Sequence, residues 1–243
     1  MITIDIGGIA IGIDNKYDYI AGLADAYKTE EAPLFTVAVT AEEIEDERAR
    51  SEYKGLSNGY FESIVAYRRI AEMLPRLDAF VFHGSVLAAG GKAYILTARS
   101  GVGKTTHTRL WLSEFPGECH ILNGDKPVIR YKDGVFYACG TPWRGKEMYG
   151  IYETLPIGGI AFLERGELNK SYRISTDTAL KRLAVQVYKP KERTAAIRTL
   201  ALMDRVLREV PLIRLECNMD PEAAHVARAA LISGEFNGDC NGQ

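Results

Sequence analysis

The chain has 243 residues, 47% of them hydrophobic and 26% charged, and a formal net charge of −2. This length can bury a substantial core, either as one domain or as a domain with a smaller lobe. The near-neutral charge argues against general binding to nucleic acid, and no apolar run approaches the roughly 18 residues that suggest a membrane span.

The first third of the chain predicts a small lobe without a catalytic motif. Residues 2–6 alternate apolar and polar side chains, and with the strand-like run 9–13 they flank Gly7 and Gly8, which predicts a hairpin; residues 34–40 are another predicted strand. The charge run 42–54 indicates a solvated helix or loop. Asn58 is the expected cap of a helix that reaches about Leu74. Residues 1–78 are therefore assigned to a β-rich and helical cap lobe.

The sequence 98–106 reads ARSGVGKTT and follows an apolar strand at 93–97, with a helix expected to begin near its end. A glycine loop ending in Gly-Lys-Thr between strand and helix is the pattern of a phosphate-binding P-loop, although its first position is Ala98 rather than glycine. Lys104 would reach the β- and γ-phosphates, and Thr105 would hold Mg²⁺. The alternative is an ordinary turn capped by Ser100. The predicted nucleotide-binding residues are Ser100, Gly101, Val102, Gly103, Lys104, Thr105 and Thr106.

Hairpins surround this loop. Residues 79–88 predict one strand, joined through a Gly-Gly turn to the strand that feeds the loop. Further strands are expected at 119–125, 127–131, 134–138 and 155–163, so the fold predicted is α/β, a mixed sheet around one P-loop helix. The last third is expected to be helical at 178–188 and 192–210, with a strand at 212–217. A last helix capped by Asp220 follows, and then a polar tail at 236–243.

Three residues outside the loop are candidates for catalysis. Asp125, at the end of a strand, could reach Mg²⁺ or an attacking hydroxyl, although Asp is also common in turns. His83, expected on a strand beside the P-loop strand, could act as a base or a metal ligand, or be an ordinary half-buried histidine. Arg144, in a glycine-flanked loop with Trp143, could stabilise a transferring phosphoryl group or be solvated.

The order of these motifs resembles the catalytic domain of HPr kinase/phosphorylase, a relative of the nucleotide-binding core of phosphoenolpyruvate carboxykinase. The resemblance covers residues 79–235 and points to a bacterial subgroup of HPr-kinase-like proteins rather than to true HPr kinases. It implies that His83 lies near the γ-phosphate and that Thr105 and Asp125 hold the metal. Asp125 matches the second acid of the family's Asp-Asp pair, whose first position is Gly124 here. Glu164 is one candidate for a compensating acid.

The function predicted is an ATP- and Mg²⁺-dependent kinase that phosphorylates a hydroxyl, such as a serine, on a protein, peptide or small molecule. Two alternatives stay open: a nucleotide-binding accessory or sensor module without phosphotransfer, and a carboxykinase-like reaction on a small acid. Four scattered cysteines without a CxxC pair favour reduced thiols and a cytoplasmic protein. Neither nucleic acid nor a membrane is an expected partner, and the sequence leaves open whether the chain forms a homo-oligomer.

Overall fold

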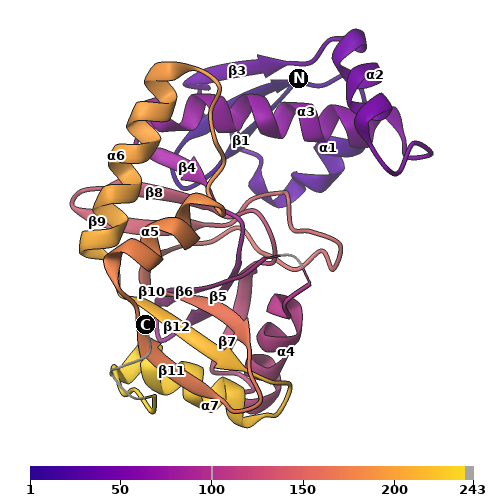
Figure 1. The fold of residues 1–243 in the computed structure, drawn as a ribbon. Helices are drawn as coiled ribbons and strands as arrows, with labels where there is room; N and C mark the ends of the chain where they lie inside the picture. Colours follow the sequence, from indigo (N-terminus) through magenta and orange to yellow (C-terminus); the bar gives the residue numbers. More distant parts are fainter. Residues whose placement is uncertain (100, 239–243) are drawn as a thin grey trace.

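A computed structural model describes residues 1–99 and 101–238 as a mixed α/β protein with two sheets (Figure 1). The smaller sheet has the order β1-β2-β3, with β1 and β2 antiparallel and β2 and β3 parallel. The predicted turn joins β1 to β2 at Gly7 and Gly8, where positive φ angles of 61° and 81° suit glycine. The strands of this sheet are β1 (Ile2–Asp5), β2 (Ala10–Asp14) and β3 (Phe35–Ala38).

Three helices accompany the small sheet, namely α1 (Asp18–Leu23), α2 (Ala41–Arg50) and α3 (Asn58–Met73). The charge run forms α2, which opens with a capping box between Thr40 and Glu43. The predicted cap of α3 was wrong by one residue: the Ser57 hydroxyl accepts from the Tyr60 amide, and Asn58 is the first helical residue. The side chain of Asn58 instead contacts Arg48 and Tyr17.

The larger sheet is mixed, as predicted. Seven of its nine strands follow the path β4-β8-β9-β10-β6-β5-β7, and the other two lie off it, with β12 paired to β10 and β11 paired to β12. Strand β10 runs parallel to β6 and β12 but antiparallel to β9. The strands are β4 (Ala79–Val81), β5 (Ser85–Ala89), β6 (Lys92–Thr97), β7 (Cys119–Asn123), β8 (Val128–Lys132), β9 (Val135–Cys139), β10 (Thr154–Arg165), β11 (Lys170–Arg173) and β12 (Leu212–Cys217).

The single strand predicted over 79–88 is divided into β4 and β5, so the placement of His83 on a strand was wrong. The break forms because the backbone here bonds to two distant segments: Phe82 N donates to Pro127 O and Gly84 N to Asp125 O, while His83 N donates to Gln186 O. Strand β4 then pairs with β8, whereas β5 pairs with β6 through the predicted Gly-Gly hairpin. His83 therefore lies in the connection between two parts of the sheet.

The helices of the larger part cover both faces of its sheet, namely α4 (Lys104–Glu114), α5 (Thr176–Ala184), α6 (Arg193–Glu209) and α7 (Glu222–Arg228). Helices α4 and α7 pack on one face around Trp111, and α5 and α6 cover the other around Phe82. In Figure 1, α6 runs down the side of the molecule and α4 and α7 lie toward the bottom. The predicted Asp220 cap was wrong, because that carboxylate accepts from Asn218 instead.

The first apolar core continues into the larger part of the chain. Buried Ile11 and Phe61 belong to the same cluster as Val81, Val128 and Trp143. Helix α3 also holds the connection before α6, because the Glu72 carboxylate accepts from the Tyr188 hydroxyl at 3.0 Å and from the Lys191 amide. The domain boundary between residues 78 and 79 stays a prediction.

Two further observations bear on the sequence-based expectations. Among residues 1–99 and 101–238, no helix has both the length and the apolar character that crossing a bilayer requires. Three of the four cysteines, Cys119, Cys139 and Cys217, are free thiols. Cys240 and the last residues of the predicted tail lie outside the described residues.

Candidate active site

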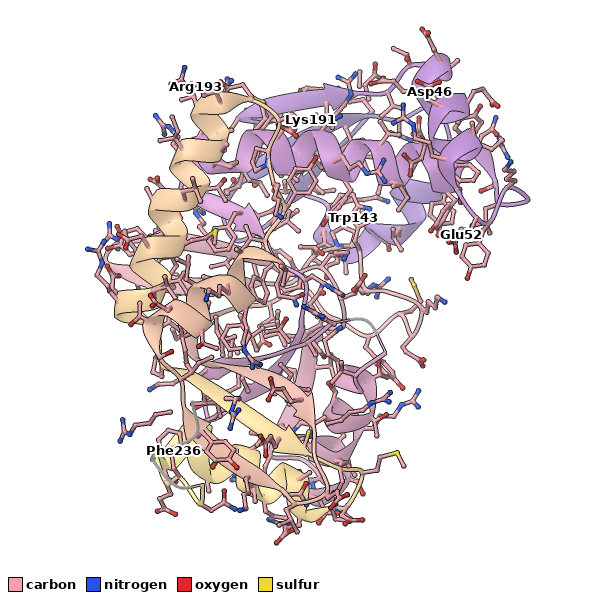
Figure 2. All side chains as sticks on the ribbon, viewed as in Figure 1. Asp46, Glu52, Trp143, Lys191, Arg193 and Phe236 are labelled. Atoms are coloured by element: carbon pink, nitrogen blue, oxygen red, sulfur yellow. The ribbon has the colours of Figure 1, made fainter. Side chains whose placement is uncertain are left out.

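A cleft of about 880 Å³ lies between the N-terminal helices α1 and α3 and the glycine loop that precedes α4. Figure 2 shows Trp143 near the junction of the two parts, below α3. Val102 does not line the cleft and packs instead against the cluster around Trp111, while Ser100 lies outside the described residues. The predicted residues that line it are His83, Gly101, Gly103, Lys104, Thr105, Thr106, Asp125 and Arg144.

The glycine loop has the backbone geometry of an anion cradle. Gly101 and Gly103 have φ angles of 80° and 125°, and a Cβ at either position would meet nothing within 4 Å. Gly103 is the N-cap of α4, so the first turn carries neither a capping side chain nor an acid. Its free amides and the helix dipole favour a bound anion. Arg165, at the end of β10, donates to Gly101 O at 2.6 Å and ties the loop to β10.

Lys104 is the cation at the centre of this cradle. Its Nζ donates to Ala98 O at 3.0 Å, across the loop. Burial lowers the pKa of Lys104, the negative charge of Asp125 opposes that shift, and nearby Lys126 adds to it. A half-buried ammonium held by one neutral carbonyl is well placed to exchange that contact for a phosphate oxygen.

Asp125 and His83 form a pair beside this lysine. His83 Nε2 lies 3.3 Å from Asp125 Oδ1, and both side chains are about one-third exposed at 31%. Burial would raise the pKa of Asp125, but the hydrogen bond from His83 and the charges of Lys126, His83 and Lys104 outweigh it and lower that pKa. Asp125 is therefore an anion at neutral pH, within the influence of Lys104.

Asn123 holds Asp125 in place. The Asn123 side chain is fully buried; its Oδ1 accepts from the amides of Asp125 and Lys126 at 3.0 and 2.8 Å, and its Nδ2 donates to Thr141 O at 3.1 Å. Asn123 is the last residue of β7, so this local turn begins where the strand ends and places Asp125 two residues beyond it. Sequence reasoning did not assign Asn123 a role, although an Asn two residues before a candidate acid is a signal for such a turn.

Gly124 explains why one acid of the expected pair is absent. A Cβ at this position would lie 2.8 Å from Arg144 O and 3.2 Å from Tyr149 O. The Gly124 amide also donates to Tyr149 O at 2.9 Å, which holds the 144–149 loop against the turn. The loop backbone therefore occupies the space that a side chain at Gly124 would need.

Glu164 does not supply the missing acid. It is absent from the cleft lining, and its carboxylate pairs with Arg182 and, at 3.7 Å, with Arg214. Within the described part of the chain, no group of three or more His, Cys, Asp or Glu side chains is placed to hold a metal. Glu147 does line the cleft, and it pairs with Arg109 at 2.8 Å.

The N-terminal helices supply a wall that sequence reasoning missed. Tyr67 packs on Trp143 with ring centroids 5.3 Å apart, and Trp143 Nε1 donates to Ser63 O at 3.1 Å. Burial and then the charge of Asp125 raise the pKa of Tyr67, which places this ring within the electrostatic reach of the acid. The residues of the N-terminal helices that line the cleft are Tyr19, Leu23, Tyr60, Ser63, Ile64 and Tyr67.

We compared the chain with protein families, curated proteins and solved structures. No protein-family model matches the sequence, and no curated protein does. Among solved structures, the chain is similar to the HPr(Ser) kinase/phosphatase from Coxiella burnetii, with 13% identity and a TM-score of 0.29 over 53% of this chain and 92% of that one. A TM-score of 0.29 is too low for this likeness to support an inference.

Proposed function

We propose that this chain is an ATP-dependent phosphotransferase that moves the γ-phosphoryl group to a hydroxyl. One observation carries the proposal: a glycine cradle with Lys104 opens into the same cleft as the Asp125–His83 pair. An anion cradle alone would only bind a nucleotide. An ionised acid within the influence of the cradle's lysine can also orient a second reactant toward the phosphate.

In the proposed reaction, Lys104 moves from Ala98 O to the phosphate oxygens and neutralises charge that grows on the leaving group. Asp125 accepts a hydrogen bond from the acceptor hydroxyl. The hydroxyl oxygen forms a bond to the γ-phosphorus as the bond from that phosphorus to the β–γ bridging oxygen breaks, and ADP leaves. The hydroxyl proton passes to Asp125. Because phosphoryl transfer depends mainly on positioning, a carboxylate with a lowered pKa can serve.

The described residues fit one Mg²⁺ ion that takes most of its ligands from the phosphates of the bound nucleotide and from water. Thr105 and Asp125 would hold the ion, and Mg²⁺ commonly binds through one or two carboxylates together with substrate phosphates. When bound, the ion would neutralise charge on the phosphates. His83, whose Nε2 lies 3.3 Å from Asp125 Oδ1, would keep the Asp125 carboxylate oriented.

The test combines nucleotide binding with phosphate transfer. Lys104→Ala should weaken binding of ATP·Mg about 10- to 100-fold, the loss expected for a charge-assisted contact. Asp125→Asn should bind ATP·Mg within a few-fold of wild type but lower transfer about 100-fold or more. Lys132→Ala and Asp133→Asn, in the β8–β9 turn away from the cleft, are matched controls. Unchanged transfer in both cleft variants would exclude the proposal.

A second candidate function is a nucleotide-binding module without transfer. The close packing at Gly124 favours it, because that packing leaves Asp125 as the single acid of the 123–126 turn. The two functions differ in one measurement: the module binds ATP·Mg in a Lys104-dependent way but gives no phosphorylated product with any acceptor.

A further inference from the structure

The cleft has a second half, facing the phosphate cradle, whose chemistry suits a particular acceptor. We propose that it binds a small hydroxy acid with an aromatic or bulky apolar body, the carboxylate on Arg144 and the body on the wall formed by Tyr19, Tyr60 and Tyr67. This inference rests on the proposed function and assigns the substrate class of that site.

Asp125 lines the cleft together with residues of both halves. Its charge acts on Lys104 in the cradle and on Tyr67 in the wall, so the acid lies within reach of both. A ligand against the wall can therefore place its hydroxyl within reach of Asp125 while Lys104 binds the phosphates. Transfer also requires the attacking and leaving oxygens to lie roughly in line with the phosphorus.

The wall is built of rings held by other side chains. Tyr60 packs edge-on against Tyr19 and Phe61 at centroid distances of 6.0 and 5.5 Å, and Tyr67 packs on Trp143 and Tyr188. Rings already ordered in this way lose little conformational freedom when a ligand binds. They favour an aromatic or bulky apolar group over a polar chain.

Arg144 supplies an unused cation in the same half. It is half-buried. Among the described residues its Nε is buried without a partner, and the one side-chain hydrogen bond that it makes runs from Nη1 to Gly150 O at 3.5 Å. Its stem lies against Gly150, and its charge acts on Tyr27 of the N-terminal part. A guanidinium with free donors there matches a carboxylate, which it can bind through two parallel bonds.

The size of the cleft favours a small molecule over a folded protein. Its volume of about 880 Å³ falls within the range of roughly 300–1,000 Å³ seen for small-molecule sites. That space must hold the nucleotide phosphates as well as the acceptor.

The 144–149 loop also contacts the N-terminal part beside the cleft, because Lys146 Nζ lies over the ring of Tyr53, 5.8 Å from its centroid.

Three probes separate the contributions of ring and carboxylate: phenyllactate has both, 2-phenylethanol lacks the carboxylate, and lactate lacks the ring. Each is titrated into the full-length chain saturated with ATP·Mg or with a non-hydrolysable analogue. Phosphorylated product and equilibrium binding are both measured. Phenyllactate should bind at least about 10-fold more tightly than either fragment, because a charge-assisted pair is worth about 1.5–3 kcal/mol.

Two cleft variants identify the groups responsible. Arg144→Gln should lose about 10- to 100-fold in affinity for phenyllactate and much less in affinity for 2-phenylethanol, which has no carboxylate. Tyr60→Leu should weaken both ring-bearing probes and leave lactate unaffected. Arg208→Gln, on the exposed face of α6, is the control. Thermal midpoints establish that each variant is folded.

The outcomes that overturn the inference differ from those that overturn the proposed function. If Arg144→Gln lowers turnover of phenyllactate and 2-phenylethanol equally, Arg144 acts on the phosphoryl group and the assignment is wrong. It is also wrong if no probe binds, or if only a peptide or protein accepts phosphate, while ATP·Mg still binds in a Lys104-dependent way. If ATP·Mg does not bind, the proposed function fails as well.

Discussion

At Gly124, close contact with the backbone of a neighbouring loop leaves no room for an acidic side chain. The carbonyls of Arg144 and Tyr149 approach the position of its missing Cβ at 2.8 and 3.2 Å. These are backbone atoms, which cannot rotate away as a flexible side chain would. The loop that carries Arg144 and the presence of a second acid therefore exclude each other in this fold.

Restoring the acid should consequently fail. Gly124→Asp is expected to destabilise the chain by about 1–3 kcal/mol, the typical cost of overpacking, and to leave transfer at or below the wild-type rate. Gly124→Ala introduces the same Cβ without the charge and should lose similar stability. Urea denaturation and the transfer assay measure the two effects. A gain of activity in Gly124→Asp at unchanged stability would contradict the packing argument.

His107 is a buried residue of α4 with neither ring nitrogen hydrogen-bonded among the described residues. Burial lowers the pKa of His107 from 6.5 to about 4. Between these two pH values the unfolded chain takes up a proton that the folded chain does not. Stability should therefore be complete above pH 6.5 and should fall as the pH drops toward 4.

The loss assigned to His107 is roughly 3 kcal/mol, from about 1.4 kcal/mol per unit of pKa. His107→Leu should remove this part of the pH dependence, and the difference in unfolding free energy from wild type should grow as the pH falls from 7 to 4. Chemical denaturation at several pH values measures it. His225→Gln, at an exposed histidine paired with Glu114, should keep the slope. A constant difference across this range would show that His107 is not the titrating group.

At the scale of elements, the turn from Asn123 to Lys126 connects the sheet to the site. One buried side chain satisfies two backbone amides within the turn and a carbonyl in the next loop. The orientation of Asp125 therefore depends on Asn123, whereas the glycine loop before α4 is held independently, by Arg165 among others.

Because Asn123 holds Asp125 but not the glycine loop, Asn123→Ala should impair phosphate transfer more than nucleotide binding. The lost bonds and the groups left unsatisfied should cost about 2–4 kcal/mol of stability. Transfer should fall by at least about 10-fold at a temperature where the variant is folded, while ATP·Mg binding changes little. Asn218→Ala removes a comparable turn, in which Asn218 Oδ1 accepts from Asp220 N outside the cleft, and should leave transfer unchanged. An equal loss of binding and transfer would show a general structural effect.

Local signals in the sequence were sufficient for the hairpins and for most long elements. The paired glycines at 7–8 and 90–91 require positive φ angles, and the strand at 212–217 was predicted with the bounds it has. The break at His83 was not predictable in this way. It forms through hydrogen bonds to residues 125, 127 and 186, and no local pattern records contacts at such distances along the chain.

The same limit applies to the cleft. The P-loop pattern placed Lys104 and Thr105 at the cleft without reference to any other part of the chain. The aromatic wall depends on how the N-terminal helices lie against the larger sheet, and tyrosines at helical spacing look the same in a core as in a binding site. Sequence reasoning could therefore select residues on the glycine-loop side of the cleft but not those on the side facing it, and phosphate binding by the loop stays a prediction.

At the scale of the whole molecule, contacts across the cleft indicate one cooperative unit. The Tyr152 hydroxyl donates to Asp5 at 2.9 Å, and Trp143 Nε1 donates to Ser63 O at 3.1 Å. The first apolar cluster contains residues from both sides of the predicted boundary at 78/79. The N-terminal part should therefore not unfold separately from the remainder.

The two tryptophans of the chain test this directly. Trp143 reports on the cluster shared with the N-terminal helices, and Trp111 reports on the face of the larger sheet that α4 and α7 cover. Trp111→Phe and Trp143→Phe each leave one reporter. Both should unfold in urea at midpoints that match circular dichroism of the same variant, because a two-state chain has coincident transitions. Saturating ATP·Mg at about 100 times its Kd should raise the unfolding free energy by about 2.7 kcal/mol at either reporter. An earlier transition at Trp143, unaffected by nucleotide, would show instead that the N-terminal part folds and opens independently of the phosphate cradle.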